Sequence, residues 1–154
     1  MKFIVIDTCV WIHAITGSIP EAMLLFDKIK IDPDLGIALD NEGLIEQECN
    51  KNCTEFFRKW INYAFSNTPI KLYYFSSNLN EEIKTELTKL KFDPSDLPFV
   101  GTTYNGDKII VTEDSDYGVG SNSKSQTSEK QAVLQYLQSI GLTIYDSTTV
   151  NSYL

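Results

Sequence analysis

The stretch Phe-Ile-Val-Ile-Asp-Thr-Cys-Val-Trp, residues 3–11, decides how the chain begins to fold. Residues 3–6 form a continuous apolar run rich in β-branched side chains, which is typical of a strand buried on both faces of a parallel sheet. Asp7 ends this run, and Thr8 can cap a helix whose apolar positions begin at Val10. Asp7 is therefore expected at a corner between a buried strand and a helix.

The same two patterns alternate through the rest of the chain. We expect further strands and helices, the strands at residues 36–39, 108–112 and 142–145 and the helices at 20–30, 44–64, 80–90, 95–104 and 129–140. Residues 67–69 break the long helix, residues 70–75 are extended with no assigned role, and a short tail follows residue 145. Strands that alternate with helices predict the α/β class, as a single Rossmann-like domain with a central parallel sheet and helices on both faces.

Length and composition fit one globular domain covering residues 1–154, with 42% hydrophobic and 22% charged residues. Residues 118–128 are mostly small and polar, so we expect a flexible loop there. No apolar stretch approaches the ~20 residues that a membrane-spanning helix needs. Three cysteines, an odd number, favour free thiols in a reducing compartment, which predicts a cytoplasmic protein.

Acidic residues follow several of the expected strands. Asp7, Asp40 and Asp114 each come directly after one, at the sheet edge where ligands bind in open α/β sheets. Carboxylates converging there repel each other by about 1–4 kcal/mol per pair at ~4 Å, so folding needs a compensating charge. Mg²⁺ or Mn²⁺ supplies it, because these ions prefer carboxylate oxygens and also coordinate phosphate. An acidic pocket thus becomes able to bind a phosphodiester despite the net charge of −8.

Three segments together resemble the PIN-domain nucleases. They are the opening residues 3–12, residues 96–105 (Asp-Leu-Pro-Phe-Val-Gly-Thr-Thr-Tyr-Asn), and residues 110–117 (Ile-Val-Thr-Glu-Asp-Ser-Asp-Tyr). PIN domains are Rossmann-like and include the toxin ribonucleases of bacterial toxin–antitoxin pairs. The resemblance implies a Mg²⁺- or Mn²⁺-dependent ribonuclease that hydrolyses RNA phosphodiester bonds. Its protein partners would be an antitoxin and a second copy of the chain.

The resemblance also implies which acids hold the metal. The family has an aspartate after the first strand, a glutamate on the helix after the second, an aspartate opening the helix before the fourth, and another aspartate after that strand. The matching positions here are Asp7, Glu48, Asp96 and Asp114, with Asp116 as a fifth ligand. The second acid stays open, because Glu46 and Asp40 lie close to Glu48 in the sequence. Gly43-x-Ile45-x-x-Glu48 looks most like the family's glutamate helix.

Each of these residues also has a purely structural interpretation. Asp7 can cap a helix, Asp96 can favour a helix dipole in the first turn, and Asp114 with Asp116 can form a turn. Four further residues, Cys9, His13, Cys49 and Cys53, formally make a zinc set, although thiols on apolar helix faces are usually core residues. Three basic residues, Lys51, Arg58 and Lys59, either contact phosphates or form a solvated helix face.

Other functions remain as alternatives to a nuclease. A non-catalytic PIN-like domain that binds RNA or acts as a scaffold would keep the fold without the chemistry. A Rossmann-like metal-dependent phosphatase of the haloacid dehalogenase type also ends its first strand with an aspartate. That chemistry needs a second aspartate two residues further on, where this chain has Cys9.

Overall fold

A five-stranded, all-parallel sheet forms the centre of the molecule in the computed structural model, which describes residues 1–66 and 70–154. The strands, in the order β3-β2-β1-β4-β5 across the sheet, are β1 (Lys2–Ile6), β2 (Leu35–Asp40), β3 (Leu72–Phe75), β4 (Ile109–Val111) and β5 (Thr143–Tyr145). Residues 4–6 of β1 and all of β2 are buried, as expected for continuous apolar runs in a parallel sheet. The predicted α/β class with a Rossmann-like parallel sheet is confirmed.

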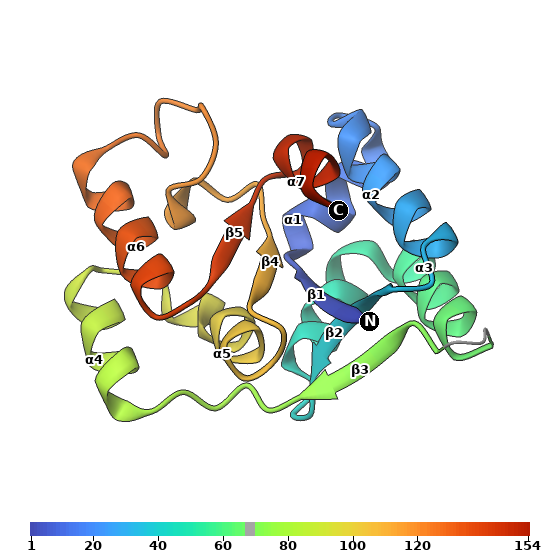
Figure 1. The fold of residues 1–154 in the computed structure, drawn as a ribbon, viewed down its shortest axis with the longest axis horizontal. Coiled ribbons are helices and arrows are strands. Elements are labelled where there is room, and N and C mark those ends of the chain that lie inside the picture. The colour runs from blue at the N-terminus through green and yellow to red at the C-terminus, as the bar shows by residue number, and fades with distance from the viewer. Residues whose placement is uncertain (67–69) are drawn as a thin grey trace.

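Seven α-helices in the described part of the chain flank this sheet. They are α1 (Thr8–Thr16), α2 (Pro20–Ile31), α3 (Leu44–Ser66), α4 (Glu81–Lys89), α5 (Leu97–Asn105), α6 (Ser128–Ser139) and α7 (Ser147–Tyr153). There are also two single-turn 3₁₀ helices: η1 (Pro94–Asp96) directly precedes α5, and η2 (Ser115–Tyr117) follows β4. Figure 1 shows α1, α2 and α3 gathered on one side of the sheet and α4, α5 and α6 on the other. Helices on both faces were predicted.

The core on the first of these sides is aromatic. Trp11 of α1 packs against Phe26 of α2 and Phe57 of α3, with ring centroids 4.4 and 5.0 Å apart. All three rings are fully buried, and tilted or edge-on contacts between aromatic rings are favourable beyond the area they bury. This packing holds the first turn of α1, which follows Asp7, against α3.

Helix α3 is bent, whereas the sequence predicted one regular helix. The backbone of Cys53 leaves the helical conformation (φ −150°, ψ 49°). The side chains of Asn52, Cys53 and Thr54 donate to the carbonyl oxygens of Glu48, Cys49 and Asn50, four residues earlier in each case. Such side-chain bonds to the preceding turn compete with the backbone ladder and bend helices. The bend comes one turn after Glu48.

Three other expectations differ from the structure or lie outside it. Residues 72–75 form β3, an edge strand, because they pair with β2 from Ile37 to Asp40. The expected short tail is wrong: α7 forms there because Asp146 accepts from the Thr149 amide and Val150 is buried. The helix break expected at residues 67–69 lies outside the described residues.

A loop was predicted at residues 118–128, and residues 118–127 form one, whereas Ser128 begins α6; one side chain of this loop is buried. Ser125 is fully enclosed, and its hydroxyl donates to the carbonyl oxygens of Gly120 and Asn122. Gln131 of α6 donates to the carbonyls of Gly118 and Ser125. Polar contacts, rather than apolar packing, thus tie this loop to α6. Its flexibility stays a prediction.

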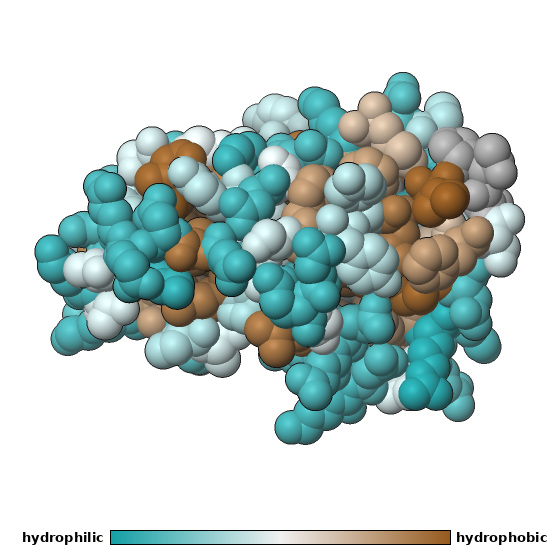
Figure 2. All heavy atoms as spheres, turned by 90° about the horizontal axis from the view of Figure 1, so that it is seen from below, coloured by the Kyte–Doolittle hydropathy of each residue, from teal (hydrophilic) through white to brown (hydrophobic). Residues whose placement is uncertain are grey.

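The surface is largely polar. On the face seen in Figure 2, hydrophilic residues cover most of the surface, and hydrophobic ones gather toward the right of the view with smaller spots elsewhere. Within the described residues, no single helix is both long and apolar enough to cross a membrane; α1 and α2, bent by 104°, pass that test only when counted together.

Candidate metal centre at the carboxyl edge of the sheet

The candidate site lies where β1 and β4 end side by side. Val5 and Ile6 pair with Ile110 and Val111, and the amide of Asp7 donates to the Val111 carbonyl at 3.0 Å. The chain proceeds from β1 outward to β2 and β3, then returns to place β4 on the other side of β1. Ligands bind at such a reversal of strand order, beyond the carboxyl ends of the strands.

A pocket of about 280 Å³ opens at this edge, and all four predicted acids line it. They are Asp7, Glu48, Asp96 and Asp114. Thr8, Cys9, Ile12 and Asn52 line the remaining wall. Acids from the end of β1, from α3, from η1 and from the end of β4, separated by up to 107 residues in the sequence, thus share one cavity.

Asp7 is the most deeply buried of the four. Its Oδ2 accepts a 2.7 Å hydrogen bond from Thr112 Oγ1, and its Oδ1 accepts from the Thr8 amide at 2.8 Å. Burial raises the pKa of Asp7 to about 6, against the opposing effect of these hydrogen bonds, and the charge of Asp114 raises it further. Asp7 does cap α1, not Thr8 as expected, so it is both a capping and a pocket residue.

Asp96 ends η1 and precedes α5, yet it makes no side-chain capping bond to that helix. Asp93 instead caps η1. Burial, followed by the negative charges of Asp7 and Asp114, raises the pKa of Asp96 to about 8. Among the residues that the structure describes, no hydrogen-bond donor opposes this rise in the pKa of Asp96. A helix-capping role therefore does not explain why a carboxyl group is buried at this position.

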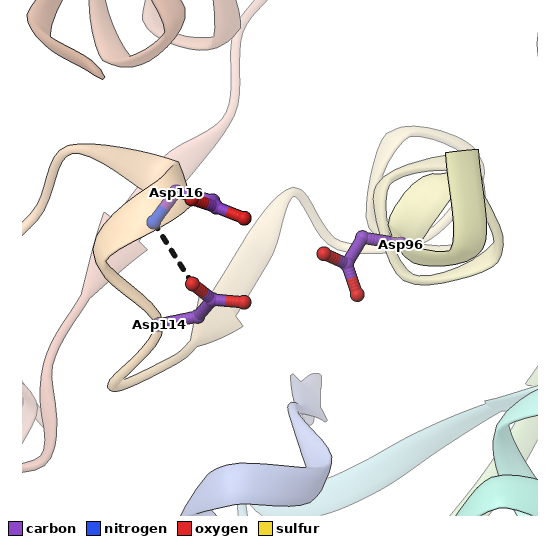
Figure 3. Close-up of side chains that lie close together, drawn as sticks. All are labelled: Asp96, Asp114 and Asp116. Atoms are coloured by element: carbon purple, nitrogen blue, oxygen red, sulfur yellow. Dashed lines mark hydrogen bonds between the residues drawn. The ribbon is translucent and has the colours of Figure 1, made fainter. Parts of the chain in front are cut away.

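Asp114 and Asp116 form the outer part of the site. Asp114 Oδ1 accepts from the Asp116 amide at 2.9 Å, which is the turn that the structural interpretation predicted. Figure 3 shows both carboxylates facing Asp96 across a gap. One oxygen from each of Asp96, Asp114 and Asp116 lies within 4.8 Å of the others. Burial raises the pKa of Asp114.

Glu48, Glu46 and Asp40, the three candidates for the acid contributed after the second strand, lie in different surroundings. Glu48 lines the pocket, where its Oε2 accepts from Thr8 Oγ1 at 3.0 Å. Glu46 points elsewhere and accepts from the Tyr74 hydroxyl at 3.2 Å. Asp40 is fully buried, and its two oxygens accept from the amides of Leu44 and Ile45. Asp40 therefore caps α3.

The formal zinc set is not assembled. Cys49 and Cys53 are buried on α3, where Cys53 donates to a backbone carbonyl, and His13 bonds to Ser18 at 2.6 Å. Cys9 lies in the acidic pocket, where burial first, then the charge of Asp7, raises its thiol pKa.

Three residues of the site had been given no role from the sequence. Thr112 lies inside the Val-Thr-x-Asp motif, which was the available signal, and it orients Asp7. Lys130 forms a 2.6 Å ion pair with Asp116, and nothing in the sequence connects the two. Tyr117 is fully buried with an unpartnered hydroxyl, whose pKa is raised by burial and then by the charges of Asp7 and Asp96.

The donor set fits a hard divalent cation. Four carboxylates, the ligands that Mg²⁺ and Mn²⁺ prefer, line the cavity together with Thr8 and Asn52. A cation would also offset the burial and repulsion that raise the pKa values of Asp7 and Asp96.

Comparison of the chain with protein-family models, with curated proteins and with solved structures finds no match. The assignment of a function therefore depends on the residues and geometry of the site.

Proposed function

We propose that this protein is a Mg²⁺- or Mn²⁺-dependent ribonuclease of the PIN-domain type. The observation that carries the proposal is the meeting of Asp7, Glu48, Asp96 and Asp114 in one pocket at the junction of β1 and β4. Unrelated capping or turn-forming acids have no reason to converge on a single cavity, where their mutual repulsion opposes folding.

The four acids would hold the cation, and each is positioned differently. Thr112 and the Thr8 amide fix Asp7, and the Thr8 hydroxyl fixes Glu48. Asp96 keeps its proton near neutral pH until a cation arrives, because its pKa is about 8. When bound, the metal would lower the pKa of a coordinated water and stabilise the charge of the phosphodiester.

The substrate side of the proposal follows from charge and space. A phosphodiester is repelled by four carboxylates and attracted once cations neutralise them. Beside the pocket, Asp116 borders a second, polar hollow of about 600 Å³ between η2 and the start of α6. Two lysines, two acids and three hydroxyl side chains line it, and the lysines and hydroxyls can contact the phosphate and ribose groups of a neighbouring nucleotide. Single-stranded RNA is therefore the proposed substrate.

The alternatives fit the site less well. A scaffold domain has no use for four acids with an uncompensated repulsion. A phosphatase of the haloacid dehalogenase type needs an acid at position 9, and the Cys9 thiol there donates to Asp7 and accepts from the Glu113 amide. A cytoplasmic location accompanies the nuclease proposal, because all three cysteines are free thiols. The antitoxin partner and the homodimer stay predictions of the family resemblance.

The test is cleavage of an end-labelled single-stranded RNA by the purified protein with Mn²⁺, Mg²⁺ or EDTA. We expect cleavage with either metal, none with EDTA, and none by Asp7→Asn. The matched control is Asp34→Asn, since Asp34 is an exposed aspartate whose side chain is 84% accessible. Cleavage that survives EDTA, or an Asp7→Asn variant as active as the control, would remove the proposal.

A further inference from the structure

The acids of the site form two overlapping groups. The inner group is Asp7 and Glu48 with Asp96 and Asp114, which line the pocket together. The outer group is Asp116 with the same Asp96 and Asp114, whose oxygens lie within 4.8 Å of each other. Two carboxylates shared between neighbouring groups are the layout of sites that hold two divalent ions about 3.5–4 Å apart.

The outer group already contains a positive charge. Lys130 Nζ lies 2.6 Å from Asp116 Oδ1, and both side chains are about one-third exposed. Lys130 thus pairs with Asp116, one of the three acids that a second metal ion would need.

The backbone keeps Lys130 in this position. It lies in the first turn of α6, where its amide donates to the capping hydroxyl of Thr127. Gly118, directly after η2, packs so closely on α6 that an added Cβ would lie 2.4 Å from the Lys130 carbonyl oxygen. Gln131 also donates to the Gly118 carbonyl at 2.8 Å. The turn that carries Asp116 and the turn that carries Lys130 are therefore joined.

We infer that the Lys130 ammonium takes the place of a second metal ion, so that the site holds one divalent cation in its inner group. The inference rests on the proposed function, because it concerns the charges of the same site. A fixed ammonium repels a divalent ion from Asp116 and presents a positive charge on the outer side of the pocket. A substrate phosphate would then lie between the metal and Lys130, which makes Lys130 a positioning residue for that phosphate.

The experiment counts Mn²⁺ per chain by equilibrium dialysis, with electron paramagnetic resonance of the bound metal as a second readout. It compares wild type, Lys130→Gln and Lys89→Gln. The last is a matched control, because Lys89 also loses an ion pair, to Glu86 at 3.2 Å on α4, outside the acidic groups. Thermal melting of each protein in EDTA verifies that it is folded, and Lys130→Met, which also removes the charge, replaces Lys130→Gln if the latter does not fold. Lys130→Arg keeps the charge and serves as a second control.

We expect about one Mn²⁺ in wild type, in Lys89→Gln and in Lys130→Arg, and about two in Lys130→Gln. The two ions in Lys130→Gln should give an exchange-coupled spectrum because they share carboxylates. Two ions in wild type, or a single ion in Lys130→Gln whatever its affinity, would overturn the role of Lys130 and leave the nuclease proposal standing. Wild type that binds no Mn²⁺ would instead overturn the proposed function itself, and this inference with it.

Discussion

Thr112 Oγ1 donates a 2.7 Å hydrogen bond to Asp7 Oδ2, so the residue after β4 orients the carboxylate after β1. The same hydroxyl accepts from the Asp114 amide at 3.0 Å. One buried threonine thereby connects two acids of the site that lie 107 residues apart in the sequence.

Replacing Thr112 by valine should destabilise the protein by about 1–3 kcal/mol, because a buried carboxylate loses its donor and a buried amide its acceptor. Thr112→Ser keeps the hydroxyl and is the control. Urea unfolding measures both. The orienting role of Thr112 would be excluded if the valine and serine variants unfolded at the same urea concentration.

Glu48 and Glu46 can be distinguished by metal affinity. Glu48→Gln should weaken Mn²⁺ binding at least about tenfold, because a charged oxygen that lines the pocket is replaced by a neutral amide. Glu46→Gln should leave the affinity unchanged, since Glu46 bonds to Tyr74 outside the pocket. Calorimetric titration with Mn²⁺ gives the dissociation constant of each variant. If Glu46→Gln weakened binding and Glu48→Gln did not, Glu46 would be the metal ligand on α3.

Asp40→Asn should affect stability but not the metal site. Both Asp40 oxygens accept backbone amides at the start of α3, and an asparagine amide group would face one of these donors with a donor of its own. We expect a loss of about 1–2 kcal/mol in the free energy of unfolding, as for a lost helix cap. Mn²⁺ affinity of the folded variant should match wild type. A folded, equally stable variant that loses Mn²⁺ binding would make Asp40 a ligand.

The metal-free protein should lose stability as the pH rises from about 4 to 8. The unfolded chain releases its aspartate protons near the ordinary aspartate pKa of 3.8, whereas the native state retains them up to a pKa of about 6 at Asp7 and about 8 at Asp96. Between these values the native state binds more protons than the unfolded state, so its stability falls with rising pH. Above pH 6, Asp96 accounts for most of the slope.

Asp96→Asn should therefore melt higher than wild type at pH 8 in EDTA and show a flatter pH profile. Mn²⁺ at a hundredfold excess over its dissociation constant should stabilise wild type by about 2.7 kcal/mol and the variant much less. Scanning calorimetry at several pH values measures these differences. If the variant melted lower than wild type without metal, yet responded to Mn²⁺ equally, Asp96 would have only a helix-capping role.

Local sequence patterns determined four of the five strands, most of the helices and the edge positions of two pocket acids. The apolar run before Asp7 can only be buried between two layers, and an acid that ends such a strand must lie at the sheet edge. The same reasoning applied to Asp114. Asp96 and Glu48 followed from the family pattern, and the structure places both in the same pocket.

Only the tertiary structure decided which acids meet and what opposes their charge. The return of the chain to place β4 beside β1 depends on the packing of whole helices on the sheet. The choice of Glu48 over Glu46 depends on how α3 is rotated against α1, because the two residues lie on different helix faces. The approach of Lys130 to Asp116 depends on the loop that folds α6 back onto η2. Each of these is a long-range contact, and local propensity and periodicity carry no information about the partner of such a contact.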